Sequence, residues 1–90
     1  MEKNEIDLAL EQLDNLLRYA PNHVMGLTEY GKILVFHKKD YKSALKILKR
    51  SMRICDKSPG IYGAMGVAYY KVGKLDYAVP CLKLSRELDK

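Results

Sequence analysis

The residues that could do chemistry are few and are not grouped. The two histidines, His23 and His37, are 14 positions apart, and no cysteine or carboxylate pattern near them has the spacing of a metal site. The two cysteines, Cys55 and Cys81, have neither a CxxC spacing nor a nearby histidine partner, which predicts free thiols in a reducing compartment. No glycine-rich phosphate loop, nucleophile elbow or carboxylate pair is present. We therefore expect no enzymatic activity, no metal and no cofactor.

The polar start of the chain predicts no signal peptide. No apolar run approaches the ~18 residues that a membrane-spanning helix needs. Together with the free thiols, these observations predict a cytoplasmic protein without a membrane span.

Charge is patterned along the chain. Residues 1–20 carry five acids and two bases, residues 21–58 carry nine bases and three acids, and the net charge of the chain is +5. Six basic residues at helical spacing form what we name the basic stripe: Lys42, Lys46, Lys49, Arg50, Arg53 and Lys57. This stripe could bind RNA or another polyanion, meet the acidic first helix of a neighbouring subunit, or be a solvated helix face. Nucleic-acid binding lacks support, because no aromatic residue interleaves with the stripe and no nucleic-acid-binding motif is present.

Small and apolar residues recur along the chain at a nearly constant interval. One set recurs after 34 residues, where Tyr41, Ala44, Leu45, Leu48 and Ser51 match Leu75, Ala78, Val79, Leu82 and Ser85. A second set recurs after 35 residues, where Leu27, Tyr30, Gly31 and Leu34 match Tyr62, Met65, Gly66 and Tyr69. Spacings of three, four and seven within each set predict one face of an α-helix. The slip from 34 to 35 predicts one extra residue in the turn around Lys38–Asp40, and the two glycines predict close helix contacts.

Stop and start signals divide the pattern into five helices. We expect them near 4–19, 23–37, 41–56, 59–72 and 75–89. Asn22 and Asp40 are the expected caps of the second and third helices. Ser58-Pro59 should begin the fourth helix and Gly73 should end it. Pro80 lies inside the fifth helix and should bend it.

This pattern resembles the tetratricopeptide repeat family. The best match is residues 59–90, where Tyr62, Met65-Gly66, Tyr69, Gly73, Leu75, Ala78, Leu82 and Leu88-Asp89 stand at the spacing of the family signature. Residues 22–57 match less well, because Lys-Lys-Asp replaces the turn glycine. The resemblance implies an all-α fold, an α-solenoid of antiparallel helix hairpins with about two and a half repeats. Residues 1–90 would form one domain, in which 4–21 is the second helix of a partial repeat and 22–57 and 58–90 are full repeats.

The resemblance also implies a protein-interaction module or scaffold whose first helices line a concave groove. Carried over to this chain, the predicted groove residues are Met25, Thr28, Lys32, Val35, Phe36, Gly60, Gly63, Val67, Tyr70 and Lys71. This lining is mostly apolar and lacks the paired donors that hold an acidic peptide terminus. We therefore expect it to bind an apolar peptide or helix of a partner protein. The alternative for Val35, Phe36 and Val67 is simple packing in the core.

Both terminal helices are expected to have an uncovered apolar side. In the last helix, Leu75, Ala78, Val79 and Leu82 form the predicted core stripe, and Tyr77, Cys81, Leu84 and Leu88 form a second stripe where a following repeat would dock. In the first helix, Ile6, Leu10, Leu13, Leu16 and Leu17 lack the helix that would precede them in a full repeat. Terminal repeats normally need a polar outer face. We therefore expect a homo-oligomer with the second stripe in its interface, the alternative being a fragment with frayed ends.

Overall fold

The computed structural model describes residues 3–89, and this part of the chain is helical and contains no strand. Its elements are α1 (Lys3–Tyr19), α2 (Val24–Ile33), the π-helical segment η1 (Leu34–Lys38), α3 (Tyr41–Ile54), α4 (Pro59–Lys71) and α5 (Leu75–Leu88). The all-α prediction is confirmed. When η1 is counted as the end of the second helix, the expected helix bounds agree with the observed ones to within about two residues, which is the usual uncertainty at helix ends.

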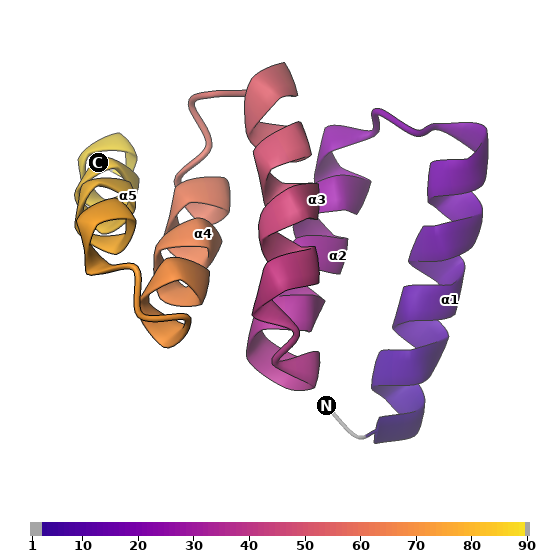
Figure 1. The fold of residues 1–90 in the computed structure, drawn as a ribbon. Helices are drawn as coiled ribbons and strands as arrows, with labels where there is room; N and C mark the ends of the chain where they lie inside the picture. Colours follow the sequence, from indigo (N-terminus) through magenta and orange to yellow (C-terminus); the bar gives the residue numbers. More distant parts are fainter. Residues whose placement is uncertain (1–2, 90) are drawn as a thin grey trace.

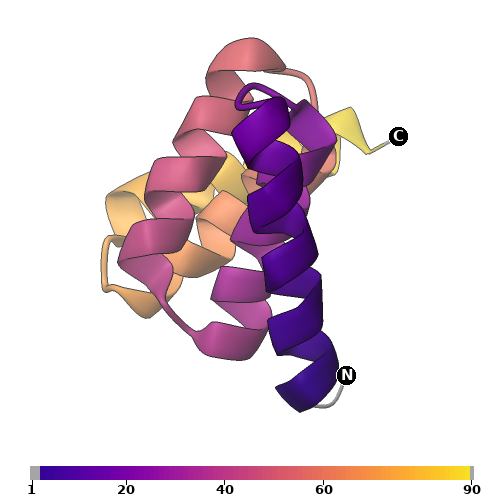
Figure 2. The same cartoon turned by 90° about the vertical axis from the view of Figure 1, so that its right-hand side faces the viewer.

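The helices follow one another in a row, each packed against the next in the chain (Figure 1). The helices α1 and α5 lie at opposite ends of the row, and α1 is the foremost element when the row is viewed from its N-terminal end (Figure 2). Contacts also join α2 to α4, the first helices of the two complete hairpins. A hairpin with one apolar face is thus covered by the hairpin that follows it, which is how repeat arrays build a continuous core.

The core lies where α2, η1, α3 and α4 meet. Ala44, Leu48, Ile61 and Ala68 have no accessible surface at all. Gly31 brings α2 close to α3, because a Cβ atom there would lie 2.5 Å from Leu48 Cδ2. The equivalent glycine of the next hairpin, Gly66, does the same between α4 and α5. The close helix contacts predicted from the two glycines are confirmed.

The extra residue of the 35-residue interval lies in a different place from the one predicted. It is absorbed by the π-helical turn of η1, at the end of the helix, and not by the turn around Lys38–Asp40 alone. In the second hairpin, the Lys74 N–H bonds to the Tyr69 carbonyl oxygen at 2.9 Å, which closes the helix end in the usual way. In the first hairpin, the Asp40 N–H bonds to the Leu34 carbonyl oxygen at the same distance, around a loop that is one residue longer.

Lys39 takes the left-handed conformation, with φ 56°, that Gly73 takes in the second hairpin. A side chain disfavours this conformation by about 1–2 kcal/mol, and glycine offsets part of that through its greater freedom in the unfolded chain. We therefore expect Lys39→Gly to raise the free energy of unfolding by about 0.5–1 kcal/mol in urea titrations followed by circular dichroism. The matched control is His37→Gly, at an exposed position inside η1, where glycine should lower it by about 1 kcal/mol. Equal effects at the two positions would contradict the prediction.

The helix caps agree with the sequence in two places and differ in one. Asp40 Oδ1 accepts a bond from the Ser43 N–H at 3.4 Å, and Pro59 occupies the first turn of α4 behind Ser58, as predicted. The prediction of Asn22 as the cap of α2 is wrong. The cap is His23, whose Nδ1 accepts from the Gly26 N–H at 2.9 Å. Asn22 Oδ1 instead accepts a hydrogen bond from Arg50 at 3.0 Å, because the turn places it against α3.

Candidate protein-binding surface

A pocket of about 340 Å³, here called the groove pocket, lies where α2, α4 and the end of α5 meet. Its lining residues are Lys32, Phe36, Pro59, Gly60, Gly63, Ala64, Ser85 and Asp89. Four of them, Lys32, Phe36, Gly60 and Gly63, belong to the predicted groove set. The lining is mostly small or apolar, and the Phe36 side chain in it is exposed. Such a pocket can take one apolar side chain of a bound segment.

Lys32 and Asp89 give the groove pocket one positive and one negative group. A Cβ atom at Gly60 would lie 3.2 Å from Lys32 Nζ, so the lysine side chain lies across the bare backbone of Gly60. Lys32 Nζ is also 3.7 Å from Glu29 Oε1, in a pair that solvent reaches on both sides. Exposed pairs of this kind contribute only about 0–1 kcal/mol. The ammonium can therefore turn toward a carbonyl or carboxylate of an incoming partner at little cost.

Ser85 joins two sides of the groove pocket. Its Oγ donates to the Pro59 carbonyl oxygen at 2.8 Å, and Ser51 donates to the Val24 carbonyl oxygen at 3.3 Å in the preceding hairpin. The recurring serine thus ties the second helix of each hairpin to the start of the first helix of the same hairpin. The sequence analysis missed Ser85 as a lining residue, together with Pro59, Ala64 and Asp89. The recurrence of serine after 34 residues was the one signal that pointed to Ser85.

Thr28 and Val35 do not belong to the accessible groove, which corrects the sequence prediction for both. Val35 is 2% exposed and lies in the core, because η1 packs against α3 and α4. Thr28 is buried with its Oγ1 2.7 Å from both the Val24 carbonyl oxygen and Ser51 Oγ. The alternative of simple core packing therefore holds for Val35.

The other predicted groove residues lie outside the groove pocket. Met25, Tyr70 and Lys71 are exposed, and Val67 is half-buried against the core. Their contact with a partner stays a prediction. Tyr70 is on the last turn of α4, which packs against α5 at the C-terminal end of the row.

At that end, the predicted core stripe of the last helix is mostly wrong. Ala78 is buried, but Leu75 and Val79 are exposed, because no helix within residues 3–89 packs on the far side of α5. Leu82 is 41% exposed, with part of its side chain against Gly66 of α4. In the second stripe, Tyr77 is exposed and stacks on Tyr69 with ring centroids 5.3 Å apart. The remaining members of that stripe, Cys81, Leu84 and Leu88, are half-buried, and the place of this stripe in an interface between copies stays a prediction.

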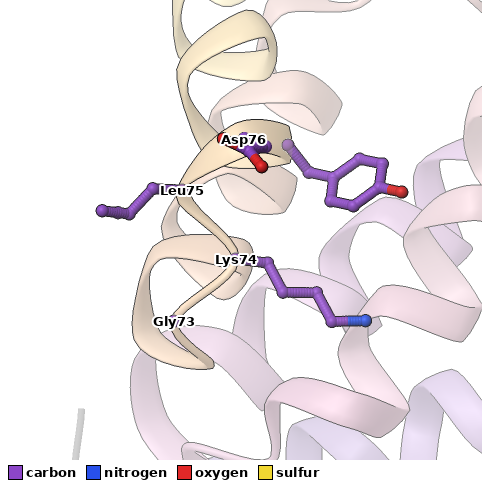
Figure 3. Close-up of a pocket in the computed structure, with 5 residues that line it drawn as sticks. Gly73, Lys74, Leu75 and Asp76 are labelled. Atoms are coloured by element: carbon purple, nitrogen blue, oxygen red, sulfur yellow. The ribbon is translucent and has the colours of Figure 1, made fainter.

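A second pocket, of about 330 Å³, lies at the turn between α4 and α5 and is lined by Gly73, Lys74, Leu75, Asp76 and Tyr77. The side chains of Lys74 and Leu75 leave the backbone in opposite directions (Figure 3). A small-molecule site needs polar groups that converge on one point. The divergent side chains of this turn do not make one.

The fold was compared with solved structures. It is similar to the chain "MamA MSR-1 C2", a tetratricopeptide-repeat protein, with a TM-score of 0.81 and 21% sequence identity over 94% of this chain. This chain has the tetratricopeptide-repeat fold. It spans 48% of that structure's chain, so the array described here is about half as long.

Two curated proteins that contain tetratricopeptide repeats are also similar in sequence. RNA polymerase-associated protein CTR9 of Caenorhabditis elegans is 27% identical over 88 residues, which cover 96% of this chain. Human protein O-mannosyl-transferase TMTC3 is 35% identical over 74 residues, which cover 82% of it. In both cases the match spans 8% of the relative, a short stretch of a much longer protein. No family model matches the chain.

In this tetratricopeptide array, five residues of the basic stripe lie on α3, and Lys57 lies in the turn between α3 and α4. All six of its residues are exposed. Two of them have partners within the chain, since Lys49 Nζ lies 5.8 Å from the centre of the Tyr69 ring and Arg50 donates to Asn22. Lys49 and Arg50 are therefore directed toward other parts of the same chain.

Two of the groups that could do chemistry, His23 and Cys81, are engaged or unreactive in the array. His23 is engaged as a helix cap. Burial raises the pKa of the Cys81 thiol, which keeps it protonated at neutral pH and a poor nucleophile. Among residues 3–89, no three His, Cys, Asp or Glu side chains form a group that could hold a metal ion. Over the same residues, no helix combines the length and apolar character needed to cross a membrane, and the cytoplasmic location stays a prediction.

Proposed function

We propose that this array is a non-enzymatic protein-interaction module that holds a peptide or helix of a partner protein. One apolar side chain of that segment would enter the groove pocket. The observation that supports this most directly is the exposed Phe36 ring beside the small residues Gly60 and Gly63. An exposed aromatic side chain next to bare backbone offers apolar contact and room for a partner main chain. Lys32 and Asp89 would orient the segment through its polar groups.

The relatives are consistent with this proposal at the level of class. CTR9 is described as RNA polymerase-associated, which is an association with protein. The transferase activity named for TMTC3 is not carried over, because this chain matches only 8% of that protein. His23 is engaged as a helix cap and the Cys81 thiol is held protonated, and the proposal includes no chemical step.

The groove can be tested with peptides selected from a displayed random library on the wild-type array. We expect Phe36→Glu to weaken binding of the selected peptides tenfold or more in fluorescence titrations. Full burial of a phenylalanine is worth about 1.5–3 kcal/mol, and about 1.4 kcal/mol is a tenfold change in affinity. Phe36 is exposed, so its replacement should leave the helical circular dichroism spectrum unchanged.

The matched control is Tyr19→Glu, an exposed aromatic residue on α1 outside the groove pocket, which should leave peptide affinity unchanged. Peptides that ignore Phe36→Glu, but lose affinity with added salt and with Lys46→Glu, would place binding on the basic stripe. Such a result would contradict the groove and favour the rival function, an adaptor for RNA or another polyanion.

We also propose that the array self-associates through its terminal helices. The support is the exposed apolar surface of α5, where Leu75, Val79 and Leu82 are accessible together. Exposed apolar clusters on a small domain are commonly covered by another molecule. Light scattering at increasing protein concentration tests this, and a monomer throughout would contradict it.

A further inference from the structure

The exposed surface of α5 is equivalent to a surface that this chain covers internally. Residues 34 apart occupy equivalent positions in α3 and α5. Leu45 and Leu48 are 9% and 0% exposed, but their equivalents Val79 and Leu82 are 55% and 41% exposed. The exposures differ mainly because α4 packs against α3, while no helix of the described chain packs on the far side of α5. The end of the array is therefore shaped to receive a helix in the way that α3 receives α4.

The first helices of the hairpins show the same change. Val35 is 2% exposed, whereas Tyr70, its equivalent 35 residues later, is 59% exposed. Tyr70 is thus the position of α4 that a helix following α5 would cover, as α4 packs against η1 and covers Val35. We name this surface the C-terminal face and define it by four residues: Tyr70, Leu75, Val79 and Leu82. A helix with an apolar anchor would cover these four side chains.

Charge indicates which helix fits. Around the C-terminal face, Lys71, Lys74, Lys83 and Arg86 are exposed, against the single acid Asp76 between residues 71 and 86. Two copies packed through this same face would bring like charges together, and like charges at an interface are unfavourable. An acidic helix would meet complementary charge.

The array has such a helix at its other end. On α1, Glu5, Leu8 and Glu11 follow at intervals of three and so share one side of the helix. All three are exposed, and Leu8 is 55% accessible. The helix α1 packs against α2, at the opposite end of the row from α5 (Figure 1). It therefore offers an apolar anchor between two carboxylates, the complement of the C-terminal face.

We propose that α1 of one copy packs on the C-terminal face of a second copy, with Leu8 between Leu75, Val79 and Leu82. This proposal rests on the proposed self-association. It adds which two surfaces meet and that the copies are joined in one direction. The contact joins two different surfaces, so each copy keeps one free end and copies add head to tail. Assembly should grow with concentration, and salt should weaken it through the charges around the contact.

The test is sedimentation velocity on two variants, each of which disables one surface. Leu8→Lys places a positive charge on α1 opposite the basic residues around the C-terminal face, and Val79→Gln replaces an apolar side chain of that face by a polar, uncharged one that does not attract the new lysine. Both positions are exposed, so both variants should fold. Wild type should form a series of oligomers, each variant alone should be weakened at least about tenfold, and an equal mixture of the two should form dimers and nothing larger. In the mixture only one intact pair of surfaces remains. Tyr19→Lys, at the exposed far end of α1, is the control and should assemble like wild type.

The possible failures are distinguishable. If Leu8→Lys alone still associates as strongly as wild type, copies meet through other surfaces, and the head-to-tail proposal is overturned while self-association survives. If the mixture of variants stays monomeric, the two surfaces do not bind each other and the proposal fails. If wild type is monomeric at every concentration, both self-association and its head-to-tail form fail. Peptide binding to the groove pocket does not depend on any of these outcomes.

Discussion

Leu48→Ala should lower the free energy of unfolding of this array by about 2–5 kcal/mol. Leu48 has no accessible surface and lies against Gly31, at the centre of the core formed by α2, η1, α3 and α4. Alanine would leave a cavity bounded by α2, which is held close by Gly31 and cannot easily collapse into it. Domains are commonly stable by only 5–15 kcal/mol, so this one change would remove a large share of the total. Urea unfolding followed by circular dichroism measures it.

The control for Leu48→Ala is Leu82→Ala, the same substitution at the equivalent position of the next hairpin. Leu82 is 41% exposed, so less apolar surface is lost and water can fill the space. We expect a loss of about 1 kcal/mol when the protein is dilute enough to be monomeric. Equal losses at the two positions would show that α4 does not cover Leu48 as described.

The equivalence of these two leucines also shows what the sequence could predict. The intervals of 34 and 35 residues, with Gly31 and Gly66 in register, predicted five helices and their order, because helical spacing reports which side of a helix is apolar. That spacing does not report whether anything packs on that side. Leu45 and Val79 therefore look alike in the sequence, but one is buried and the other is exposed.

Neither the place of the extra residue nor the whole candidate site could be predicted from the sequence. The slip from 34 to 35 residues showed that one residue was inserted, but a turn or a π-helical segment can each absorb it, and only the packing of η1 decides. Val35 was placed in the groove because its burial depends on α4, an element distant in the sequence. Lys32 and Phe36 were predicted, but Asp89 comes from the opposite end of the chain and had no local signal.

Gly31→Ala should also destabilise the array, although alanine is the better helix former by about 1 kcal/mol. The added Cβ would lie 2.5 Å and 2.6 Å from Cδ2 and Cγ of Leu48, which is fully buried and has no room to move. Overpacking of this kind typically reduces stability by about 1–3 kcal/mol. At Gly66 the added atom would meet Leu82 at 2.6 Å, but that side chain is partly exposed and can swing toward solvent, so Gly66→Ala should lose less.

A double-variant cycle separates this steric contact from any general effect of replacing glycine. In Gly31→Ala combined with Leu48→Ala, the side chain that blocks the new methyl group is gone, and the methyl group fills part of the cavity. The double variant should therefore be more stable than the sum of the two single losses predicts, by about 1–2 kcal/mol. Strictly additive losses would mean that Gly31 is required for a reason other than its contact with Leu48. In that case the distance between α2 and α3 would not depend on Gly31. This would be unexpected, because the equivalent Gly66 lies against Leu82 in the same way.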